Sequence, residues 1–296
     1  MISIGFIGLG HMGTPMAHNL IKQGHDVYLY DISPEAMEEF RSLGGTLCES
    51  ALEAADNRDV IISMLPQGKH DRNLYLGDDG LFADLSGPSF ILDCSTIDIE
   101  TSHTLHEQAA LYGHRLLDAP VSGGVVGAQN AALTFMVGGT EENFLRAKPI
   151  LDMLGKNIFH AGEATHGLAA KICNNLMLGI HMVGTCEAFI LADKLGLPKE
   201  KLFEIASASS GQSWTLQNYC PVPGLIPSCP ANANYKPGFS GEMMLKDLML
   251  AIDAAHNADI SIPLTERAGA LYDEFIQEYE QTDFSGIIQY LNNKHF

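Results

Sequence analysis

The chain has 296 residues, of which 46% are hydrophobic and 18% are charged, a composition that indicates a folded globular protein rather than a disordered or fibrous one. The formal net charge is −19, so we expect neither nucleic acid nor an anionic membrane surface as a partner, because both bind cationic surfaces. No run of about 18 apolar residues is free of charge, and the N-terminus lacks the cationic lead of a secretory signal. We therefore expect about two domains and a cytoplasmic location, or an organellar matrix if a transit peptide has been removed.

The first 160 residues alternate between short β-rich runs and helix-like segments, which predicts a parallel sheet with helices on both faces. One of these runs, residues 59–65, is almost entirely apolar, as expected for a strand that is buried on both faces. The expected strands are 2–7, 26–30, 59–65, 90–93 and 133–137, and the expected helices include 14–23 and 141–154.

The strand pattern stops at about residue 162, and apolar residues then recur at a helical spacing from 165 to 195 without a proline. This predicts one long helix that ends at Gly196 and Pro198. The helix is apolar nearly all round, so we expect it to be buried between domains or subunits. Further helices are expected at 199–210, 240–257, 263–280 and 284–292, with a loop rich in proline, asparagine and glycine at 219–238.

A dinucleotide fingerprint, Gly8-Leu9-Gly10-His11-Met12-Gly13, follows the first expected strand and opens the first expected helix. In this motif the first glycine allows the tight turn, the second lets the backbone approach a pyrophosphate, and the third lets the helix pack closely on the strand. The helix N-terminus would offer its free N–H groups to the phosphates. We therefore predict a Rossmann-type, doubly wound α/β domain at residues 1–163, joined by the long helix to an all-α domain at 164–296 for substrate binding and oligomerisation.

The second expected strand ends on Asp31, where a carboxylate can accept both hydroxyl groups of the adenosine ribose and would repel a 2′-phosphate. The next three residues, Ile-Ser-Pro, provide no cation that could hold such a phosphate. We therefore predict NAD rather than NADP as the cofactor.

Three further motifs are ambiguous when each is taken alone. The segment from Asp118 to Gly124 can form an anion-binding turn or a plain glycine-rich turn. Lys171 and Asn175 share one face of the long helix, where the lysine either extends to water or is buried as a candidate general base. Lys246 and Asp247 could be an exposed charge pair on an amphipathic helix.

Together, in this order and spacing, the four motifs resemble those of the β-hydroxyacid dehydrogenase family over essentially the whole chain: the glycine fingerprint, D-x-P-V-S-G-G, G-x₃-K-x₃-N and K-D-L. The resemblance implies that Lys171 is the catalytic lysine and that Lys246 reaches both the substrate and the nicotinamide, with Asp247 placing it. It assigns substrate binding to Ser122, Gly123, Gly124, Asn175, Lys246, Asp247 and Trp214, and cofactor binding to Gly8, Leu9, Gly10, His11, Met12, Gly13, Asp31, Leu65, Pro66, Thr96 and Lys246.

The resemblance also implies the reaction, which is the NAD-dependent oxidation of a small anionic 3-hydroxy acid. The loop from Ser213 to Phe239 favours 3-hydroxyisobutyrate, with reduction of tartronate semialdehyde or another short semialdehyde as the alternative. A non-catalytic dinucleotide-binding protein would have no need for Lys171, Asn175 and Lys246, and relatives that reduce imines typically replace the lysine. We expect a homodimer or homotetramer, because one small helical domain could hardly cover the long apolar helix.

Two positions depart from the family pattern: Thr165 and Met249 stand where glycine is often found, and we interpret both as packing variation. We expect no metal, and we assign His103 and His106 to a solvated helix face. The six cysteines lack C-x-x-C spacing, which favours reduced core residues, with a bridge between Cys220 and Cys229 as the alternative.

Overall fold

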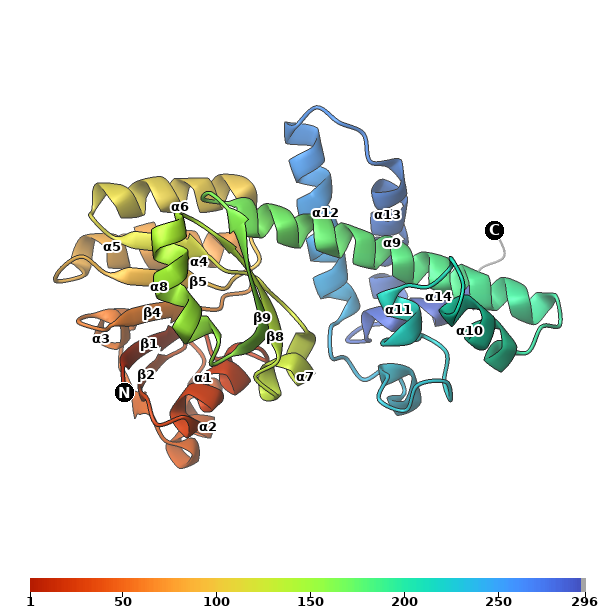
Figure 1. Ribbon diagram of the computed structural model, residues 1–296, viewed down its shortest axis with the longest axis horizontal. Coiled ribbons are helices and arrows are strands. Elements are labelled where there is room, and N and C mark those ends of the chain that lie inside the picture. The colour runs from red at the N-terminus through yellow and green to blue at the C-terminus, as the bar shows by residue number, and fades with distance from the viewer. Residues whose placement is uncertain (294–296) are drawn as a thin grey trace. The chain divides into compact units, whose positions relative to one another are not determined.

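The computed structural model describes residues 1–293, which fold as two compact units (Figure 1). The first unit comprises residues 1–171 and the second begins at residue 172, so the boundary falls inside helix α9 (His166–Lys194). The sequence had suggested a boundary at residues 163 and 164, just before this helix. An α/β unit is followed by a helical unit, which confirms the predicted fold class.

The first unit is built on a nine-stranded sheet in the order β3-β2-β1-β4-β5-β6-β8-β7, with β9 paired to β8. Strands β1 to β6 pair in parallel, as the alternation of strands and helices predicts. The strands are β1 (Ser3–Ile7), β2 (Asp26–Tyr30), β3 (Thr46–Leu47), β4 (Val60–Ser63), β5 (Phe90–Asp93), β6 (Arg115–Asp118), β7 (Val121–Ser122), β8 (Leu133–Gly138) and β9 (Gly155–Gly162).

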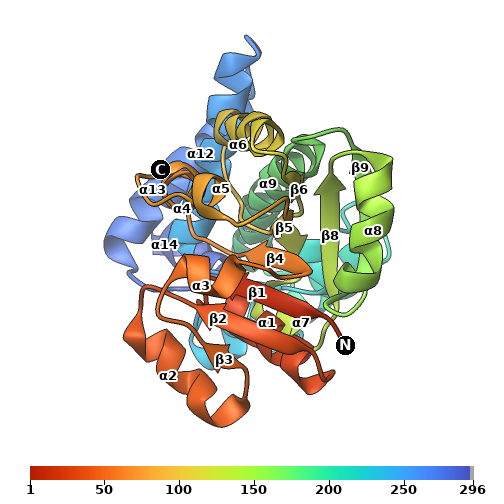
Figure 2. The same cartoon turned by 90° about the vertical axis from the view of Figure 1, so that its left-hand side faces the viewer.

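Helices cover both faces of this sheet (Figure 2). Alternate residues of each central strand pack in opposite apolar clusters. Ile62 of β4 packs in one apolar cluster with α1, α2, α7 and α8, whereas its neighbour Ile61 packs in a second cluster with α3 to α6. This arrangement explains why β4 reads as a continuous apolar run. The helices are α1 (Gly13–Lys22), α2 (Pro34–Leu43), α3 (Ala51–Ala55), α4 (Gly68–Leu76), α5 (Leu81–Asp84), α6 (Ile99–Leu111), α7 (Gly124–Gln129) and α8 (Glu141–Leu151).

The expectation of a wholly parallel sheet is wrong at one end, where β8 runs antiparallel to both β6 and β7. Only the short helix α7 separates β7 from β8. A parallel connection needs a crossover of a dozen or more residues, so a segment of this length returns the chain antiparallel. The longer helix α8 then allows β9 to pair with β8 in parallel.

The second unit is helical, as expected, and its core lies between α9, α12 and α13. Met182 and Cys186 of α9 pack in one cluster with Leu248 of α12 and Tyr272 of α13. The predicted loop at 219–238 is held down at both ends by Asp283, which accepts hydrogen bonds from the Tyr219 hydroxyl and from the amides of Gly238 and the following Phe239. The elements after α9 are α10 (Lys199–Ser207), α11 (Trp214–Gln217), η1 (Pro230–Ala233), α12 (Gly241–Asn257), α13 (Pro263–Glu278), η2 (Phe284–Gly286) and α14 (Ile287–Asn293).

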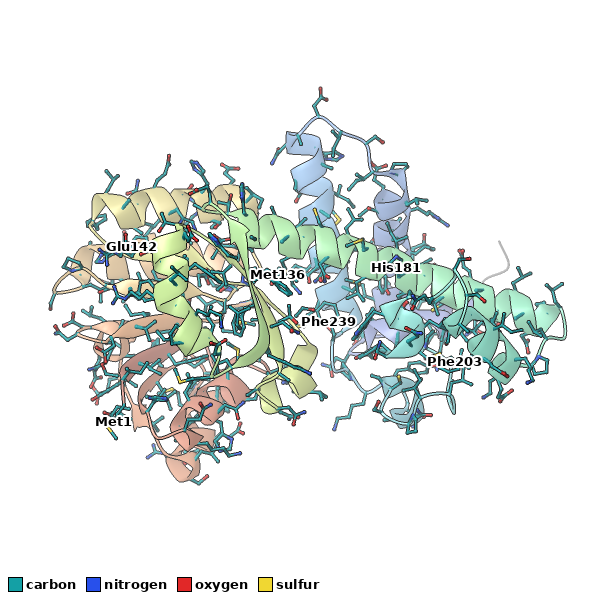
Figure 3. All side chains as sticks on the ribbon, in the orientation of Figure 1. Met1, Met136, Glu142, His181, Phe203 and Phe239 are labelled. Atoms are coloured by element: carbon teal, nitrogen blue, oxygen red, sulfur yellow. The ribbon has the colours of Figure 1, made fainter. Side chains whose placement is uncertain are left out.

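Helix α9 is less buried than its apolar sequence suggests. Its most apolar 18-residue window has a mean hydropathy of 1.4, so by length and composition alone the helix could cross a membrane. The core helix of a soluble protein passes the same test, but only 33% of this window is buried. Met177, Leu191 and Leu195 are 50%, 59% and 75% exposed. One chain alone therefore leaves part of α9 exposed, and the predicted burial of this helix between domains or subunits stays a prediction. The exposed side chains of α9 include His181, which is labelled in Figure 3.

All six cysteines lie in the described part of the chain and are free. Five of them are buried and Cys173 on α9 is exposed. Cys220 and Cys229 are therefore core thiols, and the alternative of a bridge between them is wrong.

Candidate active site

The glycine fingerprint forms the turn between β1 and α1, and two of its glycines are required by the fold itself. Gly8 has a φ of +96°, and a Cβ atom there would lie 2.4 Å from the carbonyl oxygen of Met64. A Cβ atom on Gly13 would lie 1.8 Å from the carbonyl oxygen of Gly8, so a side chain would push the helix off the strand. Gly10 differs, because nothing lies within 4 Å of the position its Cβ atom would take. The open face of the turn is therefore at Gly10, where a phosphate group could approach the backbone.

The start of α1 completes this cradle. The N-cap residue is Met12, whose side chain makes no capping hydrogen bond, and the first turn holds no acidic residue. His11 and Gly10 are exposed, while Leu9 is buried. An uncapped helix N-terminus beside an open glycine favours an anionic group, and a dinucleotide pyrophosphate fits it.

Asp31 lies directly after β2 and ties the loop together. Its Oδ2 accepts a hydrogen bond from the Leu9 amide at 2.6 Å, and its Oδ1 accepts one from the Ser33 amide at 2.7 Å. The side chain stays partly exposed, so the remaining lone pairs of the carboxylate can accept ribose hydroxyl groups. The structure thus places Asp31 beside the fingerprint, as its predicted role requires.

Leu65, Pro66 and Thr96 follow β4 and β5, at the same carboxyl edge of the sheet as the fingerprint. The Leu65 amide donates a hydrogen bond to the Ser95 hydroxyl at 2.9 Å, which joins the two loops. Open α/β sheets bind their ligands at this edge.

Ser122, Gly123 and Gly124 form the turn between β7 and α7. Gly123 and Gly124 have φ values of +132° and +62°, so this backbone favours glycine at both positions. Ser122 is partly exposed and is paired with Thr134 of β8. Consecutive amides after a strand, next to a hydroxyl group, can bind a carboxylate.

Asp118 opens the same motif and is a further site residue, which was not among those predicted from the sequence. Asp118 is 1% exposed, and its carboxylate accepts hydrogen bonds from the amides of Thr165 and Leu168 at 2.8 and 2.9 Å. These two amides bracket the first residues of α9, so Asp118 holds the start of the helix that carries Lys171. The signal that could have found it is the acidic residue at the first position of a motif whose other members are uncharged.

His106 is the third partner of Asp118, with its Nε2 3.0 Å from Oδ1 of the carboxylate. Its side chain is only 13% exposed, so assigning it to a solvated helix face was wrong. His103, by contrast, is exposed and pairs with Glu107, as expected of a solvated face. The distinction depends on the rotation of α6 against the sheet, which the i, i+3 spacing of the two histidines does not reveal.

Gly167 and Gly138 frame the Asp118 carboxylate. A Cβ atom on Gly167 would lie 2.3 Å from the carbonyl oxygen of Met136, and one on Gly138 would lie 2.5 Å from an oxygen of Asp118. The glycine that opens G-x₃-K-x₃-N is therefore explained by close packing between the start of α9 and β8.

Lys171 and Asn175 lie one turn apart on α9, and both are buried, with 7% and 1% of their surface exposed. Asn175 donates a hydrogen bond from Nδ2 to Oδ2 of Asp247 on α12. The Lys246 ammonium group lies 3.2 Å from Oδ1 of Asp247, and its side chain is 30% exposed. Asp247 thus connects Asn175 with Lys246, which are distant in the sequence.

Trp214 begins α11 and stacks on Tyr219, with ring centroids 5.3 Å apart. It is 51% exposed, so one face of an aromatic ring remains available in this unit. Its predicted role in substrate binding stays a prediction.

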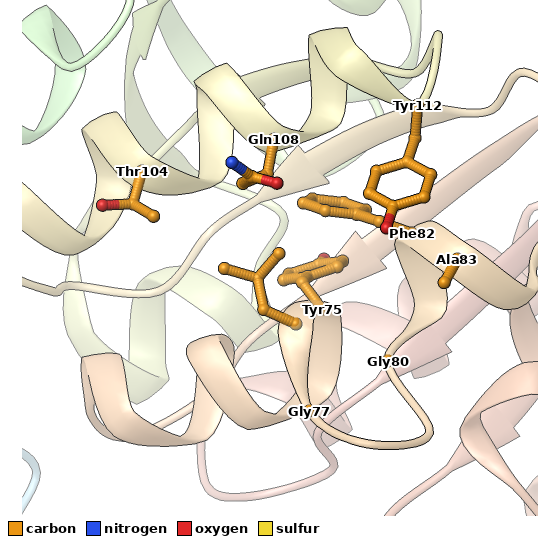
Figure 4. Close-up of a pocket in the computed structure, with 9 residues that line it drawn as sticks. Tyr75, Gly77, Gly80, Phe82, Ala83, Thr104, Gln108 and Tyr112 are labelled. Carbon is orange, nitrogen blue, oxygen red and sulfur yellow. The ribbon is translucent and has the colours of Figure 1, made fainter.

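A surface cavity of about 260 Å³ lies elsewhere, between α4, α5 and α6 (Figure 4). Tyr75 and Phe82, whose rings stack with centroids 4.9 Å apart, line it together with Gln108 and Tyr112. None of the site residues predicted from the sequence lines this cavity. Within residues 1–293, no three His, Cys, Asp or Glu side chains are grouped so that they could hold a metal ion.

Both parts of the chain match models of known protein families. Residues 3–162 match the family model of the NAD-binding domain of 6-phosphogluconate dehydrogenase, and residues 165–291 match the model described as NAD-binding of NADP-dependent 3-hydroxyisobutyrate dehydrogenase. Together the two models span nearly the whole chain.

Curated relatives match at full length. The 3-hydroxyisobutyrate dehydrogenase of Pseudomonas aeruginosa is 48% identical over 290 residues, which cover 97% of each chain. The NAD-dependent L-serine dehydrogenase of the same organism is 43% identical over 286 residues, which cover 96% of each chain.

A solved structure shows the same fold. The 3-hydroxyisobutyrate dehydrogenase of Mycobacterium tuberculosis with L-serine superposes with a TM-score of 0.93 at 41% identity, covering 98% of this chain and 99% of that one. With the glycine fingerprint, Asp31 and the lysine motif in place, the chain belongs to the β-hydroxyacid dehydrogenase family and is an NAD-dependent oxidoreductase.

Proposed function

We propose that this enzyme oxidises 3-hydroxyisobutyrate to methylmalonate semialdehyde, a step of valine breakdown. The main support for this substrate is the 48% identity to a 3-hydroxyisobutyrate dehydrogenase over 97% of both chains. When bound, NAD accepts the hydride that leaves the hydroxyl-bearing carbon of the substrate.

Lys171 is the proposed general base. Its neutral amine would accept a hydrogen bond from the substrate hydroxyl and take the hydroxyl proton during oxidation. In the reverse reaction, the ammonium group would return that proton to the substrate oxygen. The support for this role is its buried position on α9, one turn from Asn175. Asn175, held by Asp247, would orient the lysine and the substrate oxygen.

The substrate carboxylate needs local positive groups, because the protein as a whole carries a net charge of −19. Ser122 and the amides of Gly123 and Gly124 would bind the carboxylate, and Lys246 would add charge. Trp214 would supply an apolar surface to the methyl group on the substrate.

L-Serine is the second candidate substrate. It is also a 3-hydroxy carboxylate, with an amino group where 3-hydroxyisobutyrate has a methyl group, so the same lysine and carboxylate site could act on it. Two observations favour it: a relative at 43% identity is named an L-serine dehydrogenase, and the M. tuberculosis structure was solved with L-serine. Reduction of tartronate semialdehyde is the remaining alternative within the family.

The test is a steady-state assay of NADH formation by the purified enzyme with 3-hydroxyisobutyrate, 3-hydroxypropionate, L-serine and glycerate, and of NADH consumption with tartronate semialdehyde. We expect the highest kcat/KM with 3-hydroxyisobutyrate. A higher value with L-serine or with the semialdehyde would reassign the substrate and keep the family. Silence across all five compounds, with NADH still bound, would favour a non-catalytic dinucleotide-binding protein.

We also propose that the enzyme is a homodimer or homotetramer. The support is a stripe of exposed residues along α9 at helical spacing, comprising Cys173, Met177, His181, Gly184, Ala188, Leu191 and Leu195. A second copy of the chain is the proposed cover, since the small residues in the stripe would allow close helix packing. Light scattering is expected to give a multiple of the 32.0 kDa chain mass, and a monomer at micromolar concentration would contradict this.

For location we propose the cytoplasm, or an organellar matrix if a leader is removed. Relatives from Dictyostelium discoideum and mouse are named as mitochondrial. Fractionation of the source cells, followed with an antibody, would distinguish the two compartments.

A further inference from the structure

Two carboxyl groups lie next to each other in the interior of the first unit, beneath the loops that follow β4 and β5. Asp71 of α4 is fully buried and Asp93 at the end of β5 is 3% exposed. Ser63 donates a hydrogen bond to Oδ1 of Asp93 at 2.9 Å, and the Ser95 amide donates to the same oxygen at 3.0 Å. The proposed mechanism uses neither carboxyl group.

This arrangement requires a proton between the two acids. Oδ2 of Asp71 is buried and, within the described chain, no donor group supplies it with a hydrogen bond, although the side chain is a hydrogen-bond partner of Asp93. Two adjacent buried carboxylates cannot both carry a charge without a large cost in free energy. Burial, followed by the charge of Asp93, raises the pKa of Asp71 to about 9. At neutral pH, Asp71 is therefore the protonated member and donates to Asp93.

The protonated carboxyl group is linked to the cofactor loops through one serine. The Ser95 hydroxyl donates to Oδ1 of Asp71 at 2.8 Å and accepts the Leu65 amide at 2.9 Å. Thr96 is the next residue along the chain. The hydrogen bonds therefore run from Asp71 through Ser95 to both loops that are expected to contact the cofactor.

We propose that Asp71, as a protonated carboxyl group hydrogen-bonded to Asp93, is a positioning residue for dinucleotide binding, because it holds the loops at Leu65–Pro66 and Ser95–Thr96 in place through Ser95. The inference rests on the proposed cofactor contacts of Leu65, Pro66 and Thr96. It goes beyond them by naming a buried group that controls their position and a proton on which that control depends.

The other groups around the carboxyl pair do not take over this titration. The Tyr75 hydroxyl on α4 donates to Ser63, and burial raises its pKa well above the ordinary value. Burial also raises the pKa of the Cys94 thiol, which follows Asp93. His70 precedes Asp71 on α4, and the guanidinium group of Arg72 is directed to Thr101 of α6. Burial raises the pKa of Asp93 as well, so the proton that is lost as the pH rises belongs to the Asp71–Asp93 pair rather than to Tyr75 or Cys94.

The experiment is a fluorescence titration of the full-length enzyme with NADH between pH 7 and pH 10, with thermal unfolding recorded at each pH so that only folded protein is titrated. In the wild type, the Kd for NADH should rise roughly tenfold by pH 10, as the fraction with a protonated Asp71 falls. Asp71→Asn keeps an acceptor for Ser95 and a donor for Asp93, and it has no proton to lose. It should bind NADH like the wild type at pH 7 and should show no alkaline weakening.

Two further variants complete the design. Asp71→Ala removes both hydrogen bonds and should weaken NADH binding at pH 7. Asp79→Asn is the matched control, because Asp79 is exposed shortly after α4, and its pH profile should follow that of the wild type.

The proposal is overturned if Asp71→Asn weakens at alkaline pH as much as the wild type, or if the wild type does not weaken at all. Should Asp71→Ala fail to fold, the comparison of the wild type with Asp71→Asn still decides. Because NADH binding is measured without a 3-hydroxy acid, these outcomes are independent of the substrate assay, and an enzyme that fails on 3-hydroxyisobutyrate can still confirm or refute the role of Asp71.

Discussion

Asp118 and Asp71 are both buried acids of the first unit, and they are accommodated in opposite ways. Asp118 is surrounded by donors, namely two backbone amides and the His106 ring. Asp71 faces another acid and a serine, and no donor among residues 1–293 supplies its second oxygen. A folded chain can thus keep a carboxyl group inside either by offering hydrogen bonds to the anion or by leaving a proton on it. The first solution anchors the helix of the lysine, and the second anchors the loops of the cofactor.

The largest expected effect is the loss of turnover on substitution of Lys171 on α9. Lys171→Ala should lower kcat by about 10²–10⁴, the usual contribution of a positioned general base, while the Kd for NADH stays unchanged. Lys194→Ala, at the exposed far end of the same helix, is the control. Near-normal turnover of Lys171→Ala would remove the lysine from the mechanism.

Substitution by asparagine should affect the two buried acids differently. Asp118→Asn replaces one acceptor oxygen with an NH₂ group that faces amide donors, and each buried donor left without a partner costs about 1–3 kcal/mol. We expect a lower free energy of unfolding in urea and a loss of kcat that exceeds any loss of NADH affinity. If Asp118→Asn were as stable and as active as the wild type, the anchoring of α9 by this carboxylate would be wrong.

Asp71→Asn should raise the free energy of unfolding, whereas Asp118→Asn should lower it, and the size of the increase should depend on pH. The folded-state pKa of about 9 lies above that of an exposed carboxyl group, so the folded protein binds the extra proton and loses stability as the pH rises from about 4 to 9. Asp71→Asn lacks this loss. Its advantage in the free energy of unfolding should therefore grow with pH, by at most about 1.4 kcal/mol per pH unit. Urea unfolding at pH 5 and pH 8 measures it, and a constant difference would contradict the shared proton.

The smallest effect should come from Thr165, whose amide binds Asp118. Thr165 has a φ of +72°, a conformation that strains a β-branched residue by about 1–3 kcal/mol. After the entropy cost of glycine, Thr165→Gly should stabilise the protein by about 1 kcal/mol. Thr104→Gly, at a half-buried position in the middle of α6, should destabilise it. A lower Tm for Thr165→Gly would show that the strain is relieved elsewhere.

The sequence predicted those parts of the site that depend on neighbouring residues. The fingerprint and Asp31 needed only a strand, a turn and a second strand, and the structure joins them through the Leu9 amide. Lys171 and Asn175 needed only the period of a helix. Thr165 was recognised as a departure from glycine, but its positive φ became evident only in the fold.

The parts that were missed depend on elements that are distant in the sequence. His106 meets Asp118 only because α6 packs on β6 with one particular rotation, which the i, i+3 pattern of histidines does not define. Asp71 and Asp93 are unremarkable acids until α4 and β5 bring them together. The antiparallel end of the sheet follows from the short connection between β7 and β8. It was not predicted, because β6 and β7 were not recognised as strands from the sequence.

The double attachment of Asp31 matters to anyone who would redesign the enzyme for NADP. Exchanging this acid for a neutral or basic residue would admit a 2′-phosphate, but it would also strip the Leu9 and Ser33 amides of their acceptor. The Asp31 side chain is thus expected both to select the cofactor and to hold the loop in place. A successful redesign must supply a replacement acceptor, such as a serine or asparagine that reaches Leu9, together with a cation for the phosphate.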